Sequence, residues 1–240
     1  MINVYLIGYG SWGKKVFKAL KKIKKINKIF IKKNRKDHKN VNLKNINWVF
    51  ITTGINQHYL LVKGFLNKNI NVFCEKPLTT NLRQDKKLFN LAKQNKCKLY
   101  VSDIENYKKI KLVLRKNNYI SRCKLSNNKK NILERLAYHD FTYLCEKFKI
   151  SKFNKAIITS IKKGEISFKL RMNSKYFYFS YSLNSKKNIH SFNQTNLKVK
   201  KNILKIMIEN VLFGKVNYLK NEKNALFANS VINNLKQISS

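Results

Sequence analysis

The sequence predicts an α/β protein, with a doubly wound parallel sheet in its N-terminal part and a smaller α+β domain after it. Three observations lead to this expectation. A short apolar run at residues 2–7 precedes a glycine-rich turn and a helical pattern. A second apolar run, at residues 70–74, ends close to Pro77, the single proline among 240 residues. Late in the chain, stretches of alternating apolar residues predict a mostly antiparallel sheet.

The turn after the first strand has the spacing GxGxxG, formed by Gly8, Gly10 and Gly13. The first glycine permits a tight turn, the second lets the backbone approach a pyrophosphate, and the third lets helix and strand pack closely. Ser11 and Trp12 open the helix, whose N-terminal N–H groups would face phosphate oxygens. The apolar residues that then share one helical face are Val16, Phe17, Leu20 and Ile23. The sequence therefore predicts a dinucleotide site at residues 8–13.

A second strand is expected at residues 29–31, and basic residues follow it. An acid usually stands about 20 residues past the glycines to bind a ribose 2′-hydroxyl, whereas arginine and its neighbours accept a 2′-phosphate. Lys33 and Arg35 occupy this region, and no acid occurs before Asp37. This pattern favours NADP, although NAD stays open because lysine is common throughout the chain. Residues 34–47 are too short for the usual helix and strand, so this half of the sheet is expected to be trimmed.

The next strand, at residues 48–52, ends in Thr52 and Thr53, and a helix carrying His58 follows it. The strand at residues 70–74 then leads into Glu75, Lys76 and Pro77. Because proline cannot extend the strand and keeps the residue before it out of the helical region, Lys76 is expected at the strand's carboxyl end. Open α/β sheets bind ligands at that edge. The alternative is that Pro77 only separates this strand from a helix beginning near residue 79.

The segment from Trp48 through Thr52, Thr53, Asn56 and His58 to Glu75-Lys76-Pro77, together with the glycine motif, resembles the Gfo/Idh/MocA family of oxidoreductases. The resemblance covers about the first 105 residues. It implies a Rossmann domain and a nicotinamide cofactor contacted by Thr52, Thr53, Asn56 and Glu75, with His58 supporting the cofactor turn. It also implies that Lys76 reaches the reacting hydroxyl or ketone, and that the bond between Lys76 and Pro77 can be cis.

The Rossmann domain is expected to occupy residues 1–104, ending after a strand at 98–101, and a shortened substrate domain residues 105–240. The helices expected in the substrate domain are 110–114, 131–148, 202–213 and 222–235. The strands expected there are 119–125, 156–161, 165–172 and 176–183. Residues 185–201 are the most loop-like part.

The predicted helix at residues 131–148 carries His139 and Asp140, and it resembles the family segment of members that act on sugar nucleotides. The resemblance implies that Lys76 supplies a cation for the substrate oxygen and that His139 is the acid/base. Asp140 either orients the side chains around it or only caps the helix. The alternative for His139 is a structural role as a histidine of the hydrophobic core. His38 and His190 have no partner that the sequence identifies.

The family pattern fails at Arg135, which stands where an aspartate is expected four residues before His139. Glu134 is adjacent but lies off the face that Arg135 and His139 would share on an α-helix. An arginine there would lower the pKa of His139 and could bind an anionic substrate group through its two-pronged guanidinium. The substrate-binding residues are therefore expected to be Lys76, Arg135, His139 and Asp140.

The formal net charge is +41, from 52 basic and 11 acidic residues. The lysines are spread over the whole chain. Mutational drift toward A/T-rich codons, which include those of lysine, therefore explains this charge better than nucleic-acid binding. The four cysteines form no CxxC pair, which predicts reduced thiols, a cytoplasmic location and no metal site. No secretion signal or membrane span is expected. We expect a small-molecule sugar or sugar-nucleotide partner, no specific nucleic acid and no membrane; a homo-oligomer stays open.

Three functions remain open at this stage. The first is an NAD(P)-dependent oxidoreductase that transfers a hydride between nicotinamide and a sugar or sugar-nucleotide hydroxyl or ketone. The second is a catalytically decayed NADP-binding relic or sensor, which the trimmed Rossmann half and Arg135 favour. The third is a basic nucleic-acid-binding protein. Cofactor binding separates the third from the first two, and turnover separates the first from the second.

Overall fold

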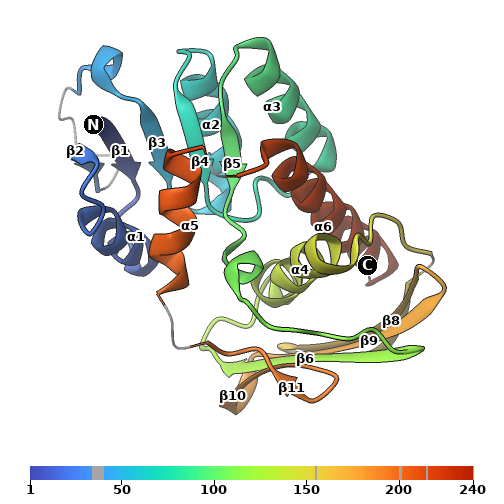
Figure 1. The fold of residues 1–240 in the computed structure, drawn as a ribbon. Coiled ribbons are helices and arrows are strands. Elements are labelled where there is room, and N and C mark those ends of the chain that lie inside the picture. The colour runs from blue at the N-terminus through green and yellow to red at the C-terminus, as the bar shows by residue number, and fades with distance from the viewer. Residues whose placement is uncertain (34–40, 155, 200–201, 215, 240) are drawn as a thin grey trace. The chain divides into compact units, whose positions relative to one another are not determined.

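The computed structural model describes residues 1–33, 41–154, 156–199, 202–214 and 216–239 (Figure 1). The chain divides into two compact units. Unit 1 comprises Met1–Ile104 and Asn202–Ala225, and unit 2 comprises Glu105–Lys201 and Leu226–Ser240. The chain therefore returns to unit 1 after residue 201, a return that a single division at residue 104 does not include.

The described residues of unit 1 form a five-stranded parallel sheet in the order β2-β1-β3-β4-β5. Its strands are β1 (Ile2–Ile7), β2 (Ile26–Lys32), β3 (Trp48–Ile51), β4 (Asn71–Cys74) and β5 (Leu99–Val101). β3 and most of β4 are buried, as expected for strands that are covered on both faces. The chain passes from β1 to β2 on one side and then to β3 on the other, so the carboxyl ends of β1 and β3 form the switch point where such sheets bind ligands.

The helices of unit 1 are α1 (Ser11–Lys21), α2 (His58–Leu66), α3 (Leu82–Gln94), α5 (Ile203–Leu212) and the first part of α6 (Tyr218–Ser239). α1 packs against α5, and α2 packs against α3 (Figure 1). α3 begins at Leu82 rather than near residue 79 because the Asn81 side chain accepts hydrogen bonds from the backbone N–H groups of Arg83 and Gln84. Between β2 and β3, residues 41–47 contain only a 3₁₀ turn, Leu43–Asn45.

Unit 2 is built, in its described part, on a six-stranded mixed sheet in the order β11-β10-β6-β9-β8-β7. Its strands are β6 (Asn117–Leu125), β7 (Ile157–Lys162), β8 (Glu165–Met172), β9 (Lys175–Ser182), β10 (Asn184–Phe192) and β11 (Thr195–Asn196). β6 and β9 run parallel, and the other described pairings are antiparallel. α4 (Tyr138–Phe148) covers one face, where Phe141 packs against Phe168 and Phe179.

The fold class expected from the sequence is confirmed, and two local expectations for unit 2 are wrong. Residues 110–114 are not helical, and Val113 is 77% exposed, so the apolar residues there do not form one buried face. Residues 185–201 are not mainly loop, because they contain most of β10 and all of β11. β10 was missed because its first residues are polar and exposed, and pairing with β6 holds it in the sheet.

The predicted helix at residues 131–148 is present, but its first part is not α-helical. Leu133–Ala137 forms a π-helical turn, and α4 continues from Tyr138. Hydrogen bonds in a π-helix join residues five apart, so the side chains follow a different register from that of an α-helix. Among the described residues, no helix combines the length and apolar character needed to cross a bilayer.

Candidate functional site

The glycine turn of unit 1 is shaped by contacts between backbone segments. Gly8 has φ +93°, and a Cβ built on it would lie 2.8 Å from the carbonyl carbon of Thr52. A Cβ on Gly13 would lie 2.2 Å from the carbonyl oxygen of Gly8. A Cβ on Gly10 would meet no protein atom within 4 Å. The first and third glycines are therefore required by the protein's own packing, whereas the open space at Gly10 suits the approach of a ligand.

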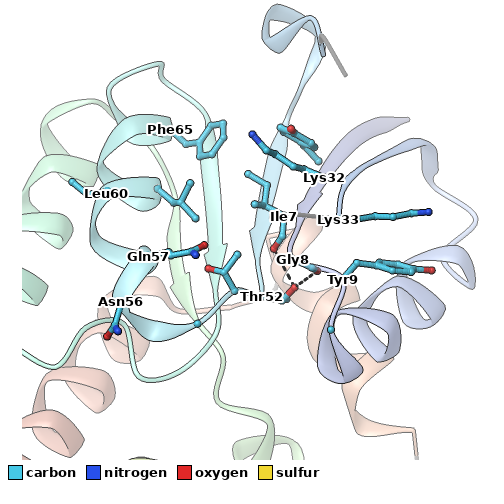
Figure 2. Close-up of a pocket in the computed structure, with 15 residues that line it drawn as sticks. Ile7, Gly8, Tyr9, Lys32, Lys33, Thr52, Asn56, Gln57, Leu60 and Phe65 are labelled. Atoms are coloured by element: carbon cyan, nitrogen blue, oxygen red, sulfur yellow. Dashed lines mark hydrogen bonds between the residues drawn. The ribbon is translucent and has the colours of Figure 1, made fainter. Parts of the chain in front are cut away.

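The side chain of Thr52 ties the end of β3 to this turn. Its Oγ1 lies 2.7 Å from the carbonyl oxygen of Gly8 and 3.2 Å from that of Ile7, and it donates its hydroxyl proton to this pair (Figure 2). The N–H of Thr52 donates to the same carbonyl of Ile7 at 2.8 Å. The carboxyl ends of β1 and β3 are thus fixed together at the switch point of the sheet.

A cavity of about 690 Å³ opens at this point of unit 1. Figure 2 shows Asn56, Gln57, Leu60 and Phe65 on one side of it, and Tyr9, Lys32 and Lys33 on the other. Six of the predicted cofactor residues line the cavity: Gly8, Gly10, Lys33, Thr52, Thr53 and Asn56. Its walls are mainly apolar, with cationic and amide groups at the rim, which is a common composition for a small-molecule site.

The other predicted cofactor residues do not line this cavity. Ser11 and Gly13 belong to the first turn of α1, next to the lining residue Gly10. Trp12, His58 and Glu75 also lie outside the lining, and Arg35 falls outside the described residues. The other lining residues were not predicted as cofactor contacts: Tyr5, Ile7, Tyr9, Lys32, Gly54, Gln57, Leu60, Leu61 and Phe65. Two of these residues could have been indicated by their positions. Tyr9 lies between two motif glycines, and Lys32 ends β2.

His58 is buried between two loops at the carboxyl edge of the unit 1 sheet. Its Nδ1 lies 3.0 Å from the carbonyl oxygen of Pro77, and its Nε2 lies 3.1 Å from that of Thr53. Burial lowers the pKa of His58, and the neighbouring carbonyl groups offset this effect only in part. A neutral imidazole carries one N–H, so it donates to one of the two carbonyls. His58 therefore lies between the turn after β3 and the Lys76–Pro77 segment, whose peptide bond is cis, and it donates to one of them.

Glu75 is buried directly before Lys76. Burial raises the pKa of the Glu75 carboxyl, while the side chains of Trp12 and Ser102 and the charge of Lys76 partly offset that rise. Its Oε2 accepts a hydrogen bond of 3.3 Å from the backbone N–H of Lys76. Glu75 therefore lies between Trp12, in the first turn of α1, and the end of β4.

In unit 2, the π-helical turn before α4 gives Glu134 and Arg135 separate roles. Glu134 is buried and forms an ion pair with Lys236 on α6. The guanidinium of Arg135 donates to the carbonyl oxygen of Asn128, and also to Oγ of Ser126 at 2.8 Å. From the sequence, Glu134 was excluded as the missing acid because it would lie off the α-helical face of His139. That reason does not apply across a π-helical turn. In the structure, the carboxylate of Glu134 is instead paired with the ammonium of Lys236.

Asp140 belongs to a cluster of buried charged side chains in unit 2. His190 Nε2 lies 2.7 Å from Asp140 Oδ1, and the Tyr181 hydroxyl donates to Oδ2 at 3.0 Å. Burial alone would raise the pKa of Asp140, but His190, Arg122 and Tyr181 outweigh it and lower this pKa. We call Glu105, Lys108, Arg122, Asp140 and His190 the ionic cluster. No partner for His190 could be identified from the sequence, although its alternation with Phe192 on a strand could have indicated a buried side chain.

Comparisons with known proteins agree with this architecture. Residues 27–103 match a family described as an oxidoreductase family with an NAD-binding Rossmann fold, GFO_IDH_MocA. No curated protein sequence matches the chain significantly.

Several solved structures share the fold over nearly the whole chain. UDP-N-acetylglucosamine 3-dehydrogenase GnnA from Acidithiobacillus ferrooxidans has a TM-score of 0.79 at 13% identity, covering 96% of each chain. A putative myo-inositol dehydrogenase from Sinorhizobium meliloti has a TM-score of 0.74 at 14% identity, covering 95% of this chain and 94% of that one.

The WlbA (WbpB) dehydrogenase from Thermus thermophilus, solved with NAD and UDP-GlcNAcA, has a TM-score of 0.74 at 11% identity, covering 97% of this chain and 94% of that one. At such identities the likeness shows the fold alone, and the sequence match to the family is confined to residues 27–103. The chain therefore matches the Gfo/Idh/MocA oxidoreductase family in sequence over residues 27–103, and it shares its fold with these dehydrogenases over nearly its whole length.

Proposed function

We propose that the protein transfers a hydride between a nicotinamide dinucleotide and a hydroxyl-bearing carbon of a sugar or sugar nucleotide. The observation that carries this proposal is the cavity of about 690 Å³ at the switch point of the unit 1 sheet, lined by Gly8, Gly10 and Thr52. The names of GnnA and WlbA connect this fold with UDP-sugars, and that of the Sinorhizobium meliloti protein connects it with a polyol.

The residues around the glycine turn fit a dinucleotide. The Cβ position of Gly10 is open, while Gly8 and Gly13 allow β1, β3 and α1 to approach closely. Gly8, Gly10, Ser11 and Gly13 would hold the pyrophosphate, and Thr52, Thr53 and Asn56 would bind farther along the cavity. A bound nicotinamide supplies the hydride acceptor or donor. The remaining steps belong to side chains of this chain.

Lys76 and His139 are the groups that we assign to the reacting oxygen. Lys76 follows the end of β4 in unit 1, and His139 stands in the first turn of α4 in unit 2. In alcohol oxidation, His139 takes the hydroxyl proton while the ammonium of Lys76 stabilises the negative charge that develops on oxygen. In ketone reduction, His139 returns that proton. Asp140 acts from within the ionic cluster, and Arg135 is the candidate for binding an anionic part of the substrate.

NADP is the proposed cofactor, with NAD as the alternative. Lys32 and Lys33 both line the cavity, and no acid follows β2 before Asp37. A 2′-phosphate brings negative charge that lysines attract, whereas a 2′-hydroxyl calls for a carboxylate. Lys33→Ala should therefore weaken NADPH binding more than NADH binding in a fluorescence titration. Equal losses for the two cofactors would leave only nonspecific charge attraction.

The experiment that tests the proposal compares Lys76→Ala with Lys87→Ala, which removes an exposed lysine from α3. With NADP⁺ and UDP-N-acetylglucosamine, related UDP-sugars and inositol as substrates, we expect Lys76→Ala to lose about 10²–10³-fold in kcat, as for a lost oxyanion donor. Its NADPH affinity should stay close to that of the parent, and Lys87→Ala should match the parent in both. Parent-like turnover by Lys76→Ala would refute the assignment.

A dinucleotide-binding protein without turnover is the second candidate. Arg135 favours it, because this residue stands where the family places an acid and its guanidinium is engaged by Ser126 and Asn128. A parent protein that binds NADPH but oxidises none of these substrates, while Arg135→Asp gains activity, would select this candidate. Cys74, Cys97, Cys123 and Cys145 form no disulfide, and this supports the cytoplasmic location that we propose for either function.

A further inference from the structure

Most side chains of the ionic cluster in unit 2 are buried, unlike those of a surface ion-pair network. Glu105, Lys108, Asp140 and His190 are each at most 7% exposed. Buried charges are costly unless they are paired and hydrogen-bonded, so a cluster of this kind needs mutual compensation. The two carboxylates, of Glu105 and Asp140, face the ammonium of Lys108 and the guanidinium of Arg122.

The imidazole of His190 has polar neighbours at both of its ring nitrogens. The Asp140 carboxylate only accepts, so an N–H on Nε2 donates to Oδ1 at 2.7 Å. On the other side of the ring, Nδ1 lies 3.4 Å from Lys108 Nζ and 3.7 Å from Glu105 Oε2. Lys108 also pairs with Glu105, which accepts from Arg122 Nη2 at 3.2 Å. A chain of polar contacts therefore runs from Lys108 through His190 to Asp140.

This chain ends on the residue that follows His139. Asp140 lies in the first turn of α4, directly after the π-helical turn Leu133–Ala137. One of its carboxylate oxygens is held by His190 of β10 and the other by Tyr181 of β9. Two bonds to different strands prevent rotation of this turn about the helix axis. A π-turn interrupts the regular register, so the preceding segment alone fixes this orientation less firmly.

We propose that His190 is a positioning residue for the reaction, because its bond to Asp140 locks the first turn of α4 and thereby orients the imidazole of His139. This inference rests on the proposed function, in which His139 carries the substrate proton. His190 itself bonds inside the cluster, facing Asp140 on α4, Lys108 and Glu105 near the start of unit 2, with Arg122 on β6 completing the charge balance.

Two substitutions of His190 separate its hydrogen bond from its bulk. His190→Phe keeps a ring but removes the donor to Asp140, whereas the amide of His190→Gln offers an N–H at a similar reach. Phe177→Leu is the control, because Phe177 is fully buried on β9, and its ring contact is with Phe179 of the same strand. It should lower the urea midpoint without touching the polar chain.

Turnover is the first readout, with NADP⁺ and UDP-N-acetylglucosamine. We expect His190→Phe to lose about 10²-fold in kcat, the scale of a misplaced catalytic group, while keeping parent-like NADPH affinity. His190→Gln should recover most of the loss, and Phe177→Leu should retain parent-like kcat at temperatures where it is folded. A His190→Phe enzyme within about twofold of the parent in kcat, well below what misplacement costs, would overturn the inference.

A second readout does not depend on turnover and separates this inference from the proposed function. The chain has four histidines, so the His139 ring signal can be assigned in an NMR spectrum with a His139→Asn variant. Its chemical shift and titration midpoint should move in His190→Phe and stay close to the parent in His190→Gln and Phe177→Leu. An unmoved His139 signal in folded His190→Phe contradicts positioning. A parent without turnover whose His139 signal moves as expected would contradict only the proposed function.

Discussion

The glycine turn of unit 1 and the histidine helix of unit 2 are built in different ways. At the glycine turn the decisive contacts are between backbone atoms, with the missing side chains of Gly8 and Gly13 allowing β1, β3 and α1 to meet. At the start of α4 the decisive contacts join side chains from η3 (Ile104–Tyr107), β9 and β10. The first kind of site depends on glycines that form a motif within six residues of sequence and on their backbone contact with Thr52, whereas the second depends on side chains from several separate elements.

The largest stability effect is expected where a buried charge loses its partner. Asp140→Ala leaves His190 and Arg122 facing a vacant acceptor, and removing one member of a buried pair costs about 3–5 kcal/mol. The control is Glu222→Ala, which breaks the 2.8 Å pair with the half-exposed Lys93 and should cost about 0–1 kcal/mol. Urea unfolding at pH 7 measures both. Equal losses would show that the ionic cluster contributes no more than a surface pair.

The same comparison has a pH dependence with a defined sign. Because the folded-state pKa of Asp140 is lowered from its ordinary value of 3.8, its ionisation stabilises the folded state at pH values above 3.8. That contribution is lost as the pH falls below 3.8 toward the folded-state pKa. The difference in unfolding free energy between parent and Asp140→Ala should therefore shrink on acidification. A difference that grows in acid would contradict the pairing.

A smaller effect is expected from equal substitutions within the glycine turn. Gly13→Ala places a Cβ against the carbonyl oxygen of Gly8, and such overpacking costs about 1–3 kcal/mol. Gly10→Ala enters open space and should stay within about 0.5 kcal/mol of the parent. Urea midpoints distinguish the two variants. Similar losses for both would mean that the close approach of β1 and α1 does not limit residue 13.

The glycine turn could be predicted from the sequence because its three glycines stand at fixed spacing within six residues, and Gly8 and Gly13 are required by close backbone contacts. The inner strands β3 and β4 of unit 1 were found for a related reason, since both of their faces are buried and their runs are apolar. The ionic cluster could not be predicted, because Glu105, Asp140 and His190 are up to 85 positions apart and ordinary in composition. β10 was missed because its pairing with β6, not its own pattern, stabilises it.

The smallest effect on stability is expected at His58, which lies between the carbonyl oxygens of Thr53 and Pro77. Burial holds the pKa of His58 below its ordinary value of 6.5, so the unfolded chain binds a proton more readily than the folded one. His58 therefore favours folding fully above pH 6.5, and this contribution declines as the pH falls through 6.5 toward the folded-state pKa. His58→Gln should make stability less pH-dependent below pH 6.5. An unchanged slope in urea titrations would contradict this origin of the dependence.

Whether the glycine turn binds a dinucleotide is tested most directly by titrating NADPH into Gly10→Val. The open space at Gly10 lets this variant fold with a urea midpoint near that of the parent, while the valine side chain fills the place assigned to the pyrophosphate. We expect the parent to bind NADPH and Gly10→Val to bind it at least about tenfold more weakly, equivalent to about 1.4 kcal/mol. A folded Gly10→Val that binds NADPH as tightly as the parent would place the cofactor site elsewhere.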